Sequence, residues 1–178
     1  MAILETHHLS RRYGSLVALD DLNLKVEAGE CFGFIGPNGA GKTTTIKILA
    51  TLLKPSSGEA RVCGFTVGWQ NTHIRPLIGY VPDFLGAYDD MLVREYLQFF
   101  ASCYGITGSR RTQVVDDALS LTDLGGKAEA PISGLSRGMS QRLAVARVLL
   151  HDPEVLLLDE PASGLDPRAR VEMRELLR

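Results

Sequence analysis

The sequence predicts an α/β fold in which antiparallel strands come first, a helical insert follows, and a buried strand near the end delivers acidic side chains. Short segments with strand-like alternation occupy much of the first eighty residues. From about residue 93 the apolar residues recur with helical spacing. At 155–158 four apolar residues stand together before two carboxylates.

The composition is that of an ordinary folded protein. The chain has 178 residues, of which 45% are hydrophobic and 22% charged, enough for one domain with a substantial core. Lys and Arg number 19 against 21 Asp and Glu, and the basic residues are scattered, so we expect no nucleic-acid partner. Cys31, Cys63 and Cys103 lack metal-ligand spacing, which favours free thiols. We expect neither a secretory signal nor a membrane-spanning segment.

Strands are predicted in the first part of the chain at residues 2–9, 22–27, 59–63 and 78–81, in addition to one that precedes the glycine-rich motif. In the second of them Leu22, Leu24 and Val26 alternate with polar residues, so one face is expected to be buried. Pro82 ends the last of them because proline has no backbone N–H to give to a sheet.

A glycine-rich motif lies between a strand-like and a helix-like segment. Residues 36–43 read Gly-Pro-Asn-Gly-Ala-Gly-Lys-Thr and match G-x-x-x-x-G-K-[ST]. Cys31 to Ile35 is predicted to be a buried strand leading into the motif, and residues 46–53 have the apolar spacing of a helix leaving it. The glycines let backbone N–H groups converge on an anion, and the helix start adds donors without intrahelical partners. The motif therefore predicts a triphosphate cradle, the alternative being an ordinary glycine-rich turn.

In such a cradle Lys42 supplies a mobile positive charge, and Thr43 is placed to give its hydroxyl to a magnesium ion that bridges the terminal phosphates. The residues predicted to bind the nucleotide here are Gly36, Pro37, Asn38, Gly39, Ala40, Gly41, Lys42, Thr43 and Thr44.

Amphipathic helices are predicted over residues 93–104 and 114–119 and from about Ser140 to Leu150. We expect their apolar stripes to form core rather than a cofactor site. Asp166 and Pro167, as a capping residue and a first-turn proline, predict the start of a last helix.

The apolar run Val155 to Leu158 is predicted to be a strand buried on both faces. Asp159 and Glu160 follow it directly. Two adjacent carboxylates would be costly to bury without partners, whereas a magnesium ion and a water molecule supply them. We therefore interpret this acidic pair as functional.

Residues 135–142, Leu-Ser-Arg-Gly-Met-Ser-Gln-Arg, resemble the LSGGQ signature of ATP-binding cassette (ABC) proteins. Ser136 precedes Asp159 with a helix and a strand between them, and the segment 163–166 follows the acidic pair in the order typical of that family. The resemblance covers essentially the whole chain. It implies a P-loop NTPase (RecA-like) core with an N-terminal antiparallel β subdomain and a helical insert, the last part of the core being missing.

By this resemblance we expect residues 1–178 to be a single ABC ATP-binding domain that is incomplete at its C-terminus. Residues 1–83 would form the β subdomain and the P-loop part of the core, 84–140 the helical subdomain, and 141–178 the signature helix, the acidic strand and the D-loop. The chain stops at Arg178, before the strand and the switch histidine that follow in the family. We therefore expect a fragment of a longer gene product, which on its own binds nucleotide weakly and hydrolyses it poorly or not at all.

The resemblance also implies roles at the nucleotide. Tyr13 would stack on the adenine, although a plain surface aromatic is the alternative. Asp159 and Thr43 would hold the magnesium ion, with Asp83 as a further candidate. Glu160 would be the catalytic residue that polarises the attacking water.

Two cassettes bind head to tail in this family, so the resemblance implies a homodimer or heterodimer that encloses two ATP molecules. The signature residues of one cassette, Ser136, Arg137, Gly138 and Met139, would close over the ATP of the other. Asp166, in the D-loop, would lie at the dimer interface. Ser136 and Asp166 are also suited to cap the helices that follow them, and for Ser136 the two roles are compatible.

The chain departs from the family pattern at three positions in these motifs. Asp83 stands where ABC proteins usually carry the glutamine of the Q-loop, which adds a negative charge near ATP. In the signature, Arg137 replaces the first glycine of the pair and Met139 replaces the glutamine. This variant, together with the segment 88–97, resembles the branch that powers bacterial exporters with separate membrane subunits.

We therefore expect a cytoplasmic ATP-binding subunit that hydrolyses MgATP to drive transmembrane permease subunits, to which it attaches at the inner face of the membrane. Phe84, Leu85 and Tyr88 could present an apolar patch to that partner. Two alternatives stay open. One is a regulatory module or fragment that binds nucleotide without hydrolysing it, against which Glu160 argues. The other is a soluble ABC ATPase of DNA repair, whose long coiled-coil or zinc insertions are absent here.

Overall fold

The chain forms two units. The computed structural model describes residues 2–83, 86 and 90–177. Unit 1 comprises residues 1–80 and 154–159, and unit 2 comprises residues 81–153 and 160–178. The chain thus returns to unit 1 for one short segment before it ends in unit 2. The predicted patch residues Phe84, Leu85 and Tyr88 lie outside the described residues.

Unit 1 contains a four-stranded antiparallel sheet in the order β2-β1-β3-β4. The strands are β1 (Ala2–Tyr13), β2 (Leu16–Glu27), β3 (Ser57–Val62) and β4 (Phe65–Thr66). Thr6 faces Leu24 on one neighbouring strand and Ala60 on the other. Its buried hydroxyl donates a hydrogen bond of 2.9 Å to the carbonyl of Leu22, so the polar atom is satisfied inside the sheet. The strands predicted at 2–9, 22–27 and 59–63 are confirmed.

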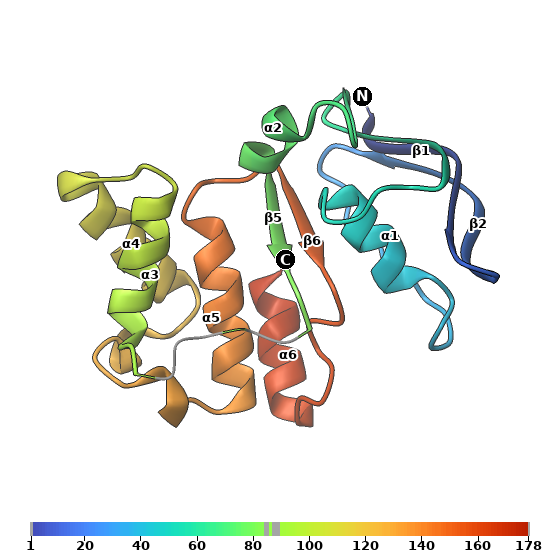
Figure 1. Ribbon diagram of the computed structural model, residues 1–178. Helices are drawn as coiled ribbons and strands as arrows, with labels where there is room; N and C mark the ends of the chain where they lie inside the picture. Colours follow the sequence, from blue (N-terminus) through green and yellow to red (C-terminus); the bar gives the residue numbers. More distant parts are fainter. Residues whose placement is uncertain (1, 84–85, 87–89, 178) are drawn as a thin grey trace. The chain divides into compact units, whose positions relative to one another are not determined.

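A second, two-stranded sheet and the helices of unit 1 complete its core. They are α1 (Lys42–Leu49), α2 (Asn71–Ile74), the 3-10 helix η1 (Arg75–Leu77), β5 (Ile78–Val81) and β6 (Val155–Leu158). The paired strands β5 and β6 run side by side (Figure 1). The backbone N–H of Glu154 donates to the carbonyl of Leu77 at 2.8 Å, which fixes the entry of the chain into β6. The buried core of the unit includes Leu9, Val26, Ile48, Leu49, Val62, Ile74, Val155 and Leu157.

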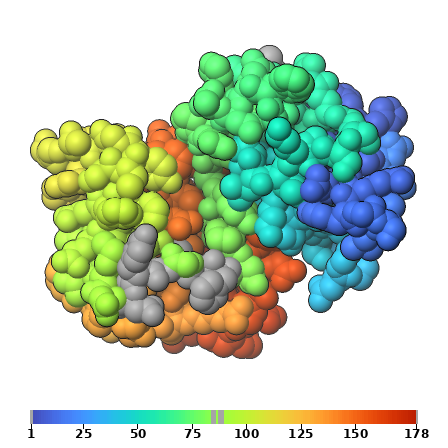
Figure 2. All heavy atoms as spheres, in the orientation of Figure 1, coloured from blue at the N-terminus to red at the C-terminus, as the bar shows by residue number. Residues whose placement is uncertain are grey.

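The prediction of a buried strand at Cys31 to Ile35 is wrong. The segment has no regular secondary structure, and Ile35 is 100% exposed. Its sky-blue spheres lie at the surface (Figure 2). A strand needs a neighbour to satisfy its backbone N–H and C=O groups, and among the described residues no strand pairs with this segment. We call residues 31–35 the approach segment.

The prediction that Val155 to Leu158 is a strand is confirmed, but burial on both of its faces is not. Val155 and Leu157 belong to the core of unit 1, whereas Leu156 is 38% exposed. Alternate residues of a strand point to opposite faces. Within the described part of unit 1, therefore, the core covers only one face of β6.

Unit 2 is helical. Its helices are α3 (Val93–Cys103), α4 (Gly108–Leu121), η2 (Gly125–Lys127), η3 (Ile132–Gly134), α5 (Arg137–Leu149) and α6 (Pro167–Leu176). Helix α5 packs against α3, α4 and α6, and its residues Leu143, Ala144 and Ala146 are fully buried. The predicted helices are confirmed, as is the expectation that their apolar stripes form core. Among the described residues, no helix is both long and apolar enough to cross a bilayer.

The chain has a single tryptophan, which lies at the surface of unit 1. Trp69 follows β4 in the turn before α2 and is 89% exposed. Together with Glu59 and Val67 it lines a surface hollow of about 490 Å³.

Candidate nucleotide-binding site

The glycine-rich loop ends at the start of α1 in a conformation that depends on two glycines. Gly39 and Gly41 have φ angles of 82° and 86°, in the left-handed region that favours glycine. Gly41 also lies close to the neighbouring strand, because a Cβ atom built on it would be only 2.7 Å from the carbonyl oxygen of Ala18. The contact with β2 therefore fixes where α1 begins.

The N-terminus of α1 is open to an acceptor. Gly41 is its N-cap, and no side chain caps the first turn. The first backbone N–H groups of a helix have no intrahelical partner and carry the positive end of the helix dipole. The residues and backbone at this point therefore fit a phosphate group.

Lys42 lies folded back over the loop. Its Nζ donates hydrogen bonds of 2.9 Å to the carbonyl oxygens of Gly36 and Pro37. The loop is further closed by the N–H of Ala40, which donates to the carbonyl of Pro37 at 3.2 Å. The ammonium group is thus held at the loop by neutral acceptors. A phosphate oxygen would make a stronger, charge-assisted hydrogen bond with it.

Thr43 and Asp159 meet although they are far apart in the sequence. The hydroxyl of Thr43, in the first turn of α1, donates a hydrogen bond of 2.8 Å to Oδ1 of Asp159, directly after β6. Asp159 is only 4% exposed, so this hydrogen bond supplies a partner that a buried carboxylate needs. Burial and the negative charge of Asp159 together raise the pKa of the Tyr80 hydroxyl.

The oxygen pair formed by Thr43 and Asp159 fits a magnesium ion. Mg²⁺ prefers hard oxygen donors and commonly takes only one or two protein ligands, the rest being phosphate oxygens and water. The described residues contain no cluster of three or more His, Cys, Asp or Glu side chains suited to a metal. Such a cluster is not required for a metal ion that is bound together with a triphosphate.

Glu160 follows Asp159 and is exposed. Its φ angle is 50°, which is uncommon for a residue with a side chain. The N–H of Ser163 donates to the carbonyl of Glu160 at 2.9 Å, so the residue begins a turn. Left-handed backbone at a residue other than glycine is often found where geometry serves a function.

In unit 2 the signature residues occupy the start of α5. Ser136 is the N-cap, and its Oγ accepts a hydrogen bond of 3.3 Å from the N–H of Met139. Gly138 lies against α6, because a Cβ atom built on it would be 3.1 Å from the Cβ of Ala169. The capping role expected for Ser136 is thus present in the structure.

Two of the departures from the family pattern lie close together in unit 2. Nη2 of Arg137 is 3.8 Å from Oδ1 of Asp83, which follows β5. The sequence pattern alone does not link these two positions.

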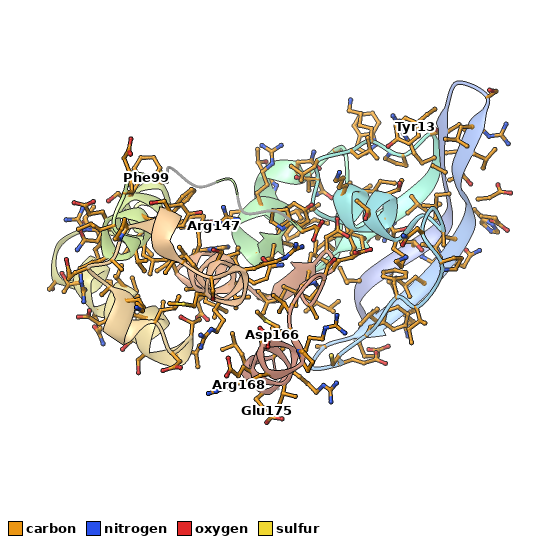
Figure 3. All side chains as sticks on the ribbon, turned by 90° about the horizontal axis from the view of Figure 1, so that it is seen from below. Tyr13, Phe99, Arg147, Asp166, Arg168 and Glu175 are labelled. Carbon is orange, nitrogen blue, oxygen red and sulfur yellow. The ribbon has the colours of Figure 1, made fainter. Side chains whose placement is uncertain are left out.

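Asp166 and Tyr13 lie at the ends of secondary-structure elements. Asp166, labelled in Figure 3 at the start of α6, accepts hydrogen bonds of 3.0 Å from the N–H groups of Arg168 and Ala169. Tyr13 ends β1 and is 46% exposed, and the Arg11 guanidinium lies 4.6 Å from the centre of its ring. The structure thus gives Asp166 a capping role and leaves a face of Tyr13 accessible to solvent.

Sequence reasoning missed two contacts, one in each unit. Ala18 limits the space at Gly41, and Arg137 lies against Gly164. The sequence does point to Gly164, because it belongs to the segment 163–166 that supports the family resemblance. Ala18 lies in β2 outside every motif, so nothing in the sequence points to its contact with Gly41.

Comparison with known proteins agrees with this geometry. The family model described as "ABC transporter" matches residues 19–163, which is more than half of the chain. The chain belongs to the ABC transporter family. The fold is accordingly that of the family's P-loop NTPase domains, as the sequence predicted.

Curated members of the family match over the whole chain. The Nod factor export ATP-binding protein I of Burkholderia pseudomallei (strain 1710b) is 43% identical over 178 residues, which are 100% of this chain and 59% of that protein. The protein of the same name from Ralstonia nicotianae is 42% identical over 99% of this chain and 55% of its own length. The chain therefore spans less than two thirds of the length of these relatives.

Solved structures of ABC proteins have the same fold. The structure of cbiO1 from Clostridium perfringens, part of the ABC transporter complex cbiONQ, has a TM-score of 0.89 and 31% identity, over 99% of this chain and 72% of that one. An ATP-binding cassette solved as a dimer in a post-hydrolysis state, bound to ADP and phosphate, has a TM-score of 0.86 and 26% identity, over 98% of this chain and 81% of that one.

Proposed function

We propose that this chain is the nucleotide-binding part of a cytoplasmic ABC transporter subunit that binds and hydrolyses MgATP. The hydrogen bond between Thr43 and Asp159 is the observation that carries the proposal. It brings a hydroxyl from the first turn of α1 to a buried carboxylate, next to helix N–H groups that no side chain caps. A magnesium ion bound there would neutralise phosphate charge and polarise the terminal phosphate.

Each residue of this proposed site has a distinct task. Lys42 would exchange the carbonyls of Gly36 and Pro37 for phosphate oxygens, and Thr43 and Asp159 would hold the magnesium ion. Glu160 would accept the proton of the attacking water. Tyr13, on β1, would offer its accessible ring face to the adenine.

The dimeric arrangement is proposed from the start of α5. Ser136 accepts a hydrogen bond there from a backbone N–H, which leaves its own hydroxyl hydrogen available to donate. Ser136 and the N–H of Gly138 would thus bind the γ-phosphate held by a second cassette. The post-hydrolysis relative was itself solved as a dimer.

Coupling to permease subunits and the direction of transport are proposed from the relatives. The curated relatives are named as export proteins, and cbiO1 is described as part of a transporter complex. By analogy, the subunit would attach to membrane partners at the inner face of the membrane and power export. The relatives extend beyond the length matched here, so these proposals concern the natural gene product.

The natural gene product with Glu160→Gln tests the proposal. This variant keeps the site's shape but removes the group that accepts a proton, so we expect it to bind MgATP without turnover. Because the γ-phosphate persists, the variant should form a stable dimer with MgATP in size-exclusion chromatography with light scattering, and a monomer without nucleotide.

Two variants serve as controls in that experiment. Lys42→Ala should abolish nucleotide binding and therefore dimer formation. Ser136→Ala, made together with Glu160→Gln, should still bind MgATP but lose the dimer. Nucleotide binding that survives Lys42→Ala, or a Glu160→Gln protein that stays monomeric with saturating MgATP, would overturn the proposal.

A further inference from the structure

We propose that Arg137 is a positioning residue that ties Asp83 to the turn carrying Glu160, and that Asp83 and Arg137 function as a coupled pair. The inference rests on the proposed function, because its effect is on the hydrolysis step assigned to Glu160. It explains two departures from the family pattern by a single interaction.

The first line of support is charge. Asp83 places a negative charge where the family carries a neutral amide, and Arg137 places a positive charge where it carries a glycine. Each alone would add an unbalanced charge to unit 2. In unit 2 the two opposite charges are 3.8 Å apart, between Nη2 of Arg137 and Oδ1 of Asp83, so the pair adds no net charge.

The second line of support is the place of the Arg137 guanidinium. A Cβ atom built on Gly164 would be 2.5 Å from Cζ and 2.6 Å from Nη1 of Arg137. The guanidinium therefore lies directly against the backbone of Gly164, and a side chain at that position would displace it. The φ angle of Gly164 is 64°, which also favours glycine.

Arg137 thus joins three segments that are distant in the sequence. Its backbone begins α5, its Nη2 lies near Asp83 after β5, and its guanidinium lies beside Gly164. Gly164 lies in a turn in which the N–H of Leu165 donates to the carbonyl of Ala162 at 3.4 Å. This turn overlaps the one that starts at Glu160, whose carbonyl accepts the N–H of Ser163. A planar, rigid guanidinium can hold both contacts at once, whereas an ammonium on a flexible stem would not.

The exposure of the Arg137–Asp83 ion pair indicates that its effect is on turnover rather than on stability. The side chains of Arg137 and Asp83 are 59% and 54% exposed. An ion pair this accessible contributes little to the stability of a fold. Its proposed effect is therefore the orientation of the turn, which would change the turnover number more than the affinity for ATP.

A double-mutant cycle on ATP turnover by the natural gene product tests the pair. We expect Asp83→Gln and Arg137→Gly to lower kcat about tenfold each, with little change in KM, because each leaves one charge unbalanced or the turn unsupported. The double variant, which also lacks the guanidinium, should lose no more than the single variants, about tenfold rather than the roughly hundredfold of independent effects, a non-additivity typical of residues in contact. Arg137→Lys should lower kcat as Arg137→Gly does, because an ammonium group cannot hold both contacts.

A second cycle tests the contact with Gly164. Gly164→Ala should lower kcat in the wild-type background, because the methyl group displaces the guanidinium. In the Arg137→Gly background the same substitution should cost less, since there is no guanidinium to displace. Equal losses in both backgrounds would contradict the contact.

A matched control uses another ion pair of unit 2. Arg168 Nε and Glu172 Oε1 form an exposed pair of 2.9 Å on α6. Arg168→Ala and Glu172→Gln should leave turnover unchanged, singly and together. If wild-type turnover is absent or survives Lys42→Ala, the proposed function fails. If wild-type turnover depends on Lys42 but the effects of Asp83→Gln and Arg137→Gly simply multiply, only the inference fails.

Discussion

At the residue scale, the hydroxyl of Thr43 has two tasks that one substitution can separate. It satisfies the buried carboxylate of Asp159 through a 2.8 Å hydrogen bond, and by the proposed function it also holds the metal ion. Thr43→Val keeps the shape but removes the donor, so Asp159 loses this partner. We expect the free energy of unfolding to fall by about 1–3 kcal/mol, as measured by urea denaturation without nucleotide.

The matched control for that prediction is Thr43→Ser, which keeps the hydroxyl. It should retain most of the stability and support magnesium-dependent nucleotide binding, whereas Thr43→Val should bind nucleotide with little response to magnesium. Equal stability of Thr43→Val and the wild type would show that Asp159 does not depend on this hydrogen bond.

The sequence predicts the identities of the site residues better than their partners. The motifs predict Lys42, Thr43 and Asp159, because a phosphate or a metal ion demands those residue types at that spacing. The acceptors of Lys42 and the left-handed φ of Glu160 were not predicted. Both depend on three-dimensional contacts and backbone geometry that have no local signal in the sequence.

At the scale of elements, Asp166 offers a test of helix capping. Its Oδ1 accepts two backbone N–H groups at the start of α6. Asp166→Ala removes this acceptor and should lower the free energy of unfolding by about 1 kcal/mol. Asp166→Asn keeps an oxygen acceptor and should be nearly neutral in the same urea titration.

The two Asp166 variants also separate capping from a role at a dimer interface. If Asp166 only caps α6, a variant should lose ATP-dependent dimer formation only to the extent that it loses stability. Asp166→Asn should then dimerise normally. A stable Asp166→Asn protein that fails to dimerise would instead assign the carboxylate charge to the interface. A stable Asp166→Ala protein would exclude the cap as a contributor to stability.

Elements were predicted well where the signal is local. The alternation in β2 and the helical spacing in α3 and α5 reflect the side on which each element is buried, and these predictions are confirmed. The strand predicted for the approach segment is wrong. An apolar run shows that its residues favour burial, but it does not show that a neighbouring strand is present. For the same reason, the apolar run at 155–158 does not show that both faces of β6 are covered, and Leu156 is partly exposed.

At the scale of the whole molecule, the approach segment should determine how the 178-residue chain behaves in solution. Ile35 and Phe32 are exposed, and among the described residues no strand pairs with the segment. Such exposed apolar surface favours association between copies. Ile35→Lys should reduce the concentration-dependent association of this chain, because a charge opposes burial of the segment. Dynamic light scattering over a range of protein concentrations measures the effect.

Leu121→Lys is the matched control, since Leu121 is an exposed apolar residue of α4 in unit 2. It should leave the association almost unchanged. If the two substitutions reduce association equally, general charge rather than the approach segment is responsible.

The position of the only indole in the chain has an optical consequence. Trp69 is already surrounded by water in the folded state, so its emission should resemble that of an unfolded chain and be readily quenched by iodide. Intrinsic fluorescence would therefore report poorly on denaturation. Circular dichroism for unfolding and a fluorophore-labelled nucleotide for ligand titrations are the appropriate probes.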